Sequence, residues 1–95
     1  MTNMIANAAV AQAAADATLR KLVADVLRLD DGGARFGPET DLKELGLESM
    51  SVVELLTQIE ISFDIVVDVD DLSSELFSRY DTLLQFVLRK ADAQR

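Results

Sequence analysis

Three stretches of the sequence repeat large apolar residues at the spacing of one face of an α-helix. The first and third have offsets of 0, 3, 4, 7 and 8, and the second has offsets of 0, 3, 4, 7 and 11. Their members are Leu19, Leu22, Val23, Val26 and Leu27; Val52, Leu55, Leu56, Ile59 and Phe63; and Tyr80, Leu83, Leu84, Val87 and Leu88. Each stretch predicts an amphipathic helix, and three of them in 95 residues predict one small helical core.

The first predicted helix is followed by a long loop that carries its own apolar residues. We expect the helix to end near Leu29, because the run from Asp30 to Gly33 is typical of a helix terminus and a loop. A loop that only crosses solvent does not need large apolar side chains. Four of them lie in this one, at Phe36, Leu42, Leu45 and Leu47. They predict that the loop is pinned across the core.

The segment between the second and last helices contains no recognisable strand pair. The run Ile65-Val66-Val67 is β-branched but has no partner strand in the sequence, so it predicts a buried connection. A short helix capped by Asp70 or Asp71 and running through Leu76 and Phe77 is expected next. The predicted fold is all-α, a four-helix bundle with three longer helices, one short helix and a long loop between the first and second.

Alanine dominates the start of the chain. Residues 1–15 predict an N-terminal extension, frayed or helical, ahead of a domain over residues 16–92. The apolar part of the extension is only about a dozen residues, and a membrane span needs about 20, so no membrane contact is expected. The first basic residue, Arg20, comes too late for a secretory signal, and the chain has no Cys, which makes the cytoplasm the expected location.

The composition excludes several kinds of chemistry. With no His and no Cys, the chain lacks an imidazole base, a thiol nucleophile and the soft ligands of metal sites, so no catalytic and no metal-binding residue is predicted. The acidic residues from Asp64 to Glu75 approach the spacing of a calcium loop, but Val66 and Val69 occupy positions 3 and 6, where that loop needs an oxygen ligand and a glycine.

The acidic residues are unevenly distributed along the chain. The net charge of -8 argues against nucleic-acid binding. Between Lys43 and Arg79 the chain has no base and nine acids, namely Glu44, Glu48, Glu54, Glu60, Asp64, Asp68, Asp70, Asp71 and Glu75. Such an interval either attracts basic partners or is a solvated face that aids solubility.

Ser49 lies at the expected start of the second helix, where serine is a favoured N-cap. Capping is one interpretation of Ser49 and modification is another, and Ser51, two residues on, competes for either role. The other interpretation is that Ser49 is modified by a second protein, since this chain has no catalytic equipment of its own. On the same helix Met50, Val53 and Thr57 share a face away from the apolar stripe.

This outer face has an acidic rim of Glu48, Glu54 and Glu60. An exposed apolar strip with an acidic rim suits a partner with a basic rim. The alternative is that the helix is buried on this side as well.

The run from Asp41 to Met50 resembles the D-L-x-x-L-G-x-D-S-L signature of acyl and peptidyl carrier proteins of fatty acid, polyketide and nonribosomal peptide synthesis. The similarity extends from about Leu19 to Leu88. It departs from the signature at two positions, where Glu48 replaces Asp and Met50 replaces Leu. These two departures bear on which transferase and which partners recognise the chain.

The resemblance implies a function and a set of partners. It implies that a phosphopantetheinyl transferase attaches 4'-phosphopantetheine from coenzyme A to Ser49, and that a loading enzyme then adds an acyl or aminoacyl group as a thioester. Downstream synthase or acyltransferase enzymes would take that group from the arm. The residues implied to contact the transferase and the partner enzymes are Glu48, Met50, Val53, Glu54 and Glu60.

Such a carrier has no catalysis of its own. We expect a monomeric, free-standing carrier that works in trans, in specialised polyketide or peptide metabolism rather than in primary fatty acid synthesis. The alternative is an unmodified acidic helical interaction module in which Ser49 is only a helix N-cap.

Overall fold

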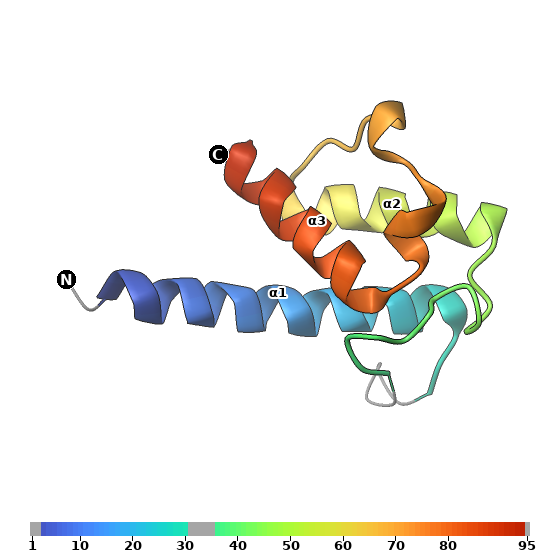
Figure 1. Ribbon diagram of the computed structural model, residues 1–95, viewed down its shortest axis with the longest axis horizontal. Helices are drawn as coiled ribbons and strands as arrows, with labels where there is room; N and C mark the ends of the chain where they lie inside the picture. The colour runs from blue at the N-terminus through green and yellow to red at the C-terminus, as the bar shows by residue number, and fades with distance from the viewer. Residues whose placement is uncertain (1–2, 31–35, 95) are drawn as a thin grey trace.

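Three α-helices and two short 3-10 helices form the protein in a computed structural model, which describes residues 3–30 and 36–94 (Figure 1). The elements are α1 (Asn3–Leu27), α2 (Ser49–Phe63), η1 (Val69–Asp71), η2 (Ser74–Phe77) and α3 (Tyr80–Ala93). Within the described residues there is no β-strand. The predicted all-α fold and its long loop between the first two helices are confirmed.

Helix α1 ends two residues before the expected position near Leu29. Arg28 adopts a left-handed conformation with φ 59°. Its N–H bonds to the Asp25 carbonyl at 3.3 Å, and the Leu29 N–H reaches back to the Ala24 carbonyl at 2.8 Å. This is a Schellman termination built on arginine instead of glycine. Gly32 and Gly33, which were expected to end the helix, lie outside the described residues.

The predicted third helix is replaced by the two 3-10 helices, and the capping role expected of Asp70 or Asp71 is wrong. The N-cap position of η2 is Ser73, which makes no side-chain cap bond. Both acids lie inside η1. The Asp71 carboxylate is directed back along the chain, where it accepts the Asp68 N–H at 3.0 Å. It is therefore not available to the N–H groups of a following helix.

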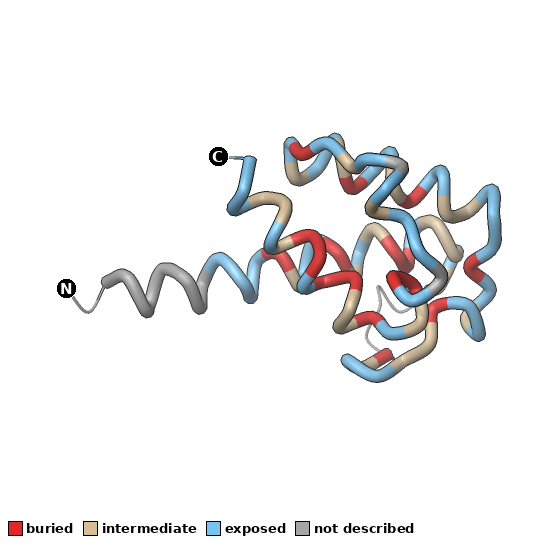
Figure 2. Tube along the Cα trace, turned by 45° about the horizontal axis from the view of Figure 1, so that its top comes forward, coloured by how far each residue is buried: buried red, intermediate tan, exposed pale blue. Residues whose placement is uncertain are grey.

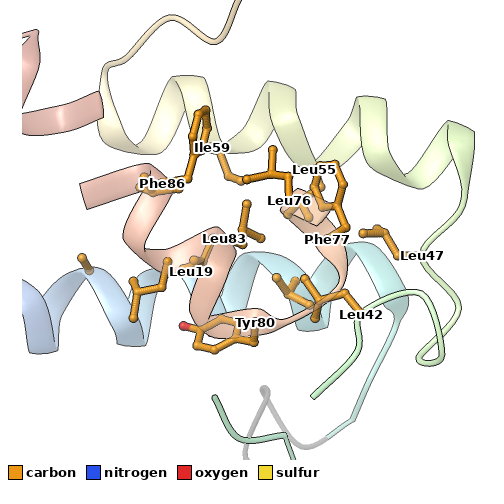
Figure 3. Packing of buried hydrophobic residues seen from close by; sticks show 14 of the residues in the cluster. Leu19, Leu42, Leu47, Leu55, Ile59, Leu76, Phe77, Tyr80, Leu83 and Phe86 are labelled. Atoms are coloured by element: carbon orange, nitrogen blue, oxygen red, sulfur yellow. The ribbon is translucent and has the colours of Figure 1, made fainter. Parts of the chain in front are cut away.

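The three apolar stripes meet in one core (Figure 2 and Figure 3). Each helix contributes residues with no exposed surface, such as Leu19 from α1, Leu55 from α2 and Leu83 from α3. The loop between α1 and α2 adds three buried anchors, Phe36, Leu42 and Leu47. Leu45 packs against the same cluster while partly buried. The prediction that this loop is pinned across the core is confirmed.

The connection after α2 is held by polar side chains. Ile65 is buried as predicted, but Val66 is 62% exposed, so the expectation of a buried run is wrong at that residue. The Gln94 side-chain amide accepts the Val66 N–H at 2.8 Å and donates to its carbonyl at 2.9 Å. Because this amide bonds the backbone as a neighbouring strand would, Val66 is satisfied without a sheet.

A polar cluster ties α1 to α3 beneath the loop. The Tyr80 hydroxyl donates to an Asp16 carboxylate oxygen at 2.6 Å, and Arg20 pairs with the same carboxylate at 3.1 Å. The Arg20 guanidinium also lies over the rings of Phe36 and Tyr80, at 5.0 and 4.8 Å from their centroids. Burial and the hydrogen bond to Asp16 raise the pKa of Tyr80 well above its ordinary value. The cluster holds one end of the bundle together.

The ion pair between Lys90 and Asp71, 2.7 Å apart, predicts a pH dependence of stability. The hydrogen bond from Lys90 lowers the pKa of Asp71, so the stabilisation is present at neutral pH and is lost as the pH falls through the folded-state pKa of Asp71. We expect Lys90→Met to be less stable than the wild type at pH 7, and the difference to vanish in acid. Urea unfolding of both proteins across the acid range measures it. A difference that persists below the aspartate titration range contradicts the assignment.

Candidate functional site

A tight turn positions the start of α2. The Asp41 carboxylate accepts the Lys43 N–H at 2.9 Å, and the Leu47 N–H returns to the Leu42 carbonyl at 3.1 Å. Leu42 and Leu47 are both buried, so the turn is anchored in the core on each side. The chain leaves the core at Glu48, which is extended with φ -135° and ψ -179°. The next residue, Ser49, begins the helix in solvent.

Gly46 is the residue that this turn requires. Its φ of 109° is a conformation that side-chain-bearing residues rarely adopt, and no atom lies within 4 Å of the place a Cβ would take. We therefore expect Gly46→Ala to destabilise the fold by about 1–3 kcal/mol through backbone strain alone. Gly37→Ala is the matched control, since it also meets open space and its φ is outside the positive region. Urea unfolding compares the two, and equal effects would contradict the role of Gly46.

The structure contradicts the interpretation of Ser49 as a helix cap. The N-cap position belongs to Glu48, whose carbonyl accepts the Val52 N–H at 2.8 Å, and no side chain makes a cap bond there. Ser49 is the first helical residue and Ser51 lies one half-turn further in, half-buried. Among the residues that the structure describes, the Ser49 hydroxyl has no hydrogen-bond partner. Ser49 is also exposed, so its hydroxyl is free to react.

The position of Ser49 fits a phosphodiester. The first N–H groups of an α-helix have no intrahelical partner, and the helix dipole places partial positive charge at this end. Within the described part of the chain, the N–H groups of Ser49, Met50 and Ser51 have no other acceptor. An anion attached to the Ser49 oxygen would thus lie beside free donors.

The outer face of α2 is exposed, as the sequence predicts. Met50 is 84% and Val53 65% exposed, which excludes the alternative of a helix buried on this side. Thr57 is also exposed, and its hydroxyl donates back to the Val53 carbonyl at 3.0 Å, so the polar group of Thr57 is satisfied within the helix. Sequence reasoning missed Ile61, which is 71% exposed. Its spacing of four residues from Thr57 continues the strip.

The three acids of the predicted rim are not equivalent. Glu48 and Glu54 are exposed and have no ion pair among the described residues. Glu60 is partly buried, and its carboxylate accepts the Val67 N–H at 2.9 Å. Glu48 and Glu54 thus leave their whole charge available to a partner, whereas Glu60 also holds the segment that follows α2.

Among the described residues, no group of three or more Asp or Glu side chains is arranged to hold a metal ion. None of their helices combines the length and the apolar character needed to cross a membrane.

Comparisons with known proteins agree on one family. The family described as "Phosphopantetheine attachment site" matches residues 17–87. Aminoacyl carrier protein 1 of Bradyrhizobium diazoefficiens is 31% identical over 68 residues, which cover 72% of this chain and 76% of that protein. Aminoacyl carrier protein 2 of the same organism is 29% identical over 69 residues, which cover 73% of this chain and 78% of that protein. No solved structure matches at a comparable significance.

Proposed function

The chain belongs to the phosphopantetheine attachment-site family of acyl and peptidyl carrier proteins, and from this premise we propose that Ser49 is its attachment residue. The prosthetic group of the family is 4'-phosphopantetheine. When bound, it supplies the thiol that this chain lacks and on which a thioester can form. The protein then presents an acyl or aminoacyl group in trans to enzymes that dock on α2.

The observation that carries the proposal is that Ser49, at the first position of α2, is exposed and its hydroxyl makes no hydrogen bond to any described residue. The turn from Asp41 to Leu47 fixes that position against the core, so a transferase meets a rigid site. No carboxylate among the described residues is within hydrogen-bond reach of the Ser49 hydroxyl and the chain has no His, so we assign the base that removes its proton to the transferase. This chain contributes the fixed position and the exposure of Ser49, together with the negative charge of α2.

The two relatives support one kind of cargo over the other. Both are named aminoacyl carrier proteins, which favours an aminoacyl group over a fatty acyl group for this chain. Its partners are then a phosphopantetheinyl transferase, an aminoacyl-loading enzyme and an enzyme that removes the aminoacyl group. An aminoacyl cargo belongs with specialised peptide metabolism rather than with primary fatty acid synthesis.

Incubation with coenzyme A and a broad-specificity phosphopantetheinyl transferase tests the proposal. Intact mass spectrometry of the wild-type protein is expected to show the gain of one phosphopantetheine group per chain. The reaction without transferase is the control and should leave the mass unchanged. A wild-type protein that stays unmodified with an active transferase, shown on a second carrier in the same tube, contradicts the proposal.

Charge reversal at Glu54 tests the docking face. Because Glu54 is exposed and unpaired within the described residues, Glu54→Lys should lower the kcat/KM of loading by about three- to tenfold at low salt and flatten its salt dependence. Asp92→Lys makes the same charge change on the exposed end of α3 and should stay within about twofold of the wild type. Equal effects of the two variants would assign the acids to solubility alone.

A further inference from the structure

An open groove lies at the end of the molecule opposite Ser49. It has a volume of ≈ 930 Å³ and is bounded by α1 from Ala11 to Thr18 and by the carboxyl ends of α2 and α3. Figure 1 shows these two helix ends above the middle of α1, whose amino-terminal part extends beyond them. Since α2 has 15 residues, the groove is roughly 20 Å from Ser49 along the helix axis. It is therefore separate from the attachment site.

The groove combines an apolar floor with an acidic rim. Phe63, Leu88 and Ala91 form much of the floor and are only partly buried. Asp64 and Asp92 are exposed at the rim, and none of the residues that line the groove is Lys or Arg. The carboxyl ends of two helices add partial negative charge at the same place. The electrostatics thus favour an apolar ligand that carries positive charge at its edges.

The charge of the chain also decides between two kinds of occupant. A second copy would bring its own net charge of -8 to an acidic rim, and the two copies would repel each other. Ala11 and Ala14, which line the groove on the side of α1, are exposed. A segment with basic flanks meets no such repulsion and would cover these residues.

We propose that this groove is a second docking site, which takes an apolar helical segment of a partner protein with Lys or Arg at its ends. The site does not depend on the modification of Ser49. It would hold a partner while the opposite end of α2 remains free for the transferase and for enzymes that act on the cargo.

The test uses the full chain and a defined probe. The probe is an amphipathic helical peptide with leucines on one face and lysines at both ends, and the control peptide has glutamates in place of the lysines. In ¹H–¹⁵N spectra, the lysine peptide should shift the amides of Ala14 and Ala91, whereas those of Met50 and Val53 stay in place. The glutamate peptide should shift neither pair.

Matched variants separate specific docking from general attraction to an acidic protein. Asp92→Lys should weaken peptide binding about fivefold, and Glu54→Lys, with the same charge change at the other end, less than twofold. Ala14→Tyr fills the groove and should abolish binding. Ala13→Tyr, on the neighbouring position of α1 that does not line the groove, should leave it unchanged. Circular dichroism confirms that each variant is folded.

Three results would overturn the inference. Equal loss of binding in Asp92→Lys and Glu54→Lys would mean attraction by net charge only. Shifts confined to Met50 and Val53 would place the peptide on the docking face of α2. Sedimentation showing a dimer that Ala14→Tyr dissociates would assign the groove to a second copy. Ser49→Ala should bind the peptide as the wild type does, so the outcome is independent of the attachment proposal.

Discussion

Ser49→Ala is expected to abolish transfer of the phosphopantetheine group. The variant removes the hydroxyl oxygen on which the phosphodiester must form, and the chain has no other nucleophile at this place except Ser51, which is half-buried one half-turn further along α2. Ser51→Ala is the matched control and should be loaded like the wild type. Intact mass spectrometry after reaction with coenzyme A and transferase compares the three proteins.

The stability of the same variant separates attachment from capping. Replacing a serine that caps a helix by alanine lowers the free energy of unfolding by about 1 kcal/mol. Because Ser49 makes no cap bond, we expect the free energy of unfolding of Ser49→Ala to stay within about 0.5 kcal/mol of the wild type. Loading that survives in Ser49→Ala would contradict Ser49 as the attachment residue. A loss of about 1 kcal/mol in its stability would favour the capping role of the interaction-module alternative.

Leu55→Ala is expected to lower the free energy of unfolding by about 2–5 kcal/mol. Leu55 is on the inner face of α2, has no exposed surface and belongs to the core cluster. Its truncation removes apolar contacts and leaves a cavity. A domain of this size has a total stability of about 5–15 kcal/mol, so the loss is a large share of it. Urea unfolding followed by circular dichroism measures the change.

Val53→Ala on the same helix is the matched control. Val53 is 65% exposed, and alanine has the higher helix propensity, so its stability should stay within about 0.5 kcal/mol of the wild type. The comparison tests which face of α2 is turned outward. A larger loss in Val53→Ala than in Leu55→Ala would contradict that orientation and, with it, the exposed docking strip.

The sequence predicts the parts of the fold that follow from apolar periodicity. The three stripes and the loop anchors Phe36, Leu42 and Leu47 are buried because large apolar groups gain most by leaving water. The helix ends were harder to predict. Arg28 and Asp64 take left-handed conformations with φ values of 59° and 54°. Aspartate tolerates this conformation, but arginine does not signal it by its type. Termination there depends on tertiary contacts as well as on local preference.

Long-range polar contacts explain the remaining differences. The capping role expected of Asp71 fails because Lys90, far along the chain, takes its carboxylate. The Glu60 carboxylate, expected only at the rim of the docking face, accepts the Val67 N–H. The Gln94 side chain accepts the Val66 N–H from the far end of α3. At the candidate site, the sequence could not show that Ser49 lacks a cap bond. This depends on the extended backbone of Glu48, which takes the N-cap position in place of Ser49. Residue type alone favoured capping.

The most direct test of the central claim is to locate the attached group on the loaded wild-type protein. All six serines lie between Lys43 and Arg79, so one tryptic peptide contains them all and its mass does not distinguish them. Fragment ions of that peptide do. We predict that the added mass appears between Glu48 and Met50, on Ser49. A group found on Ser51 or on any other residue would contradict it.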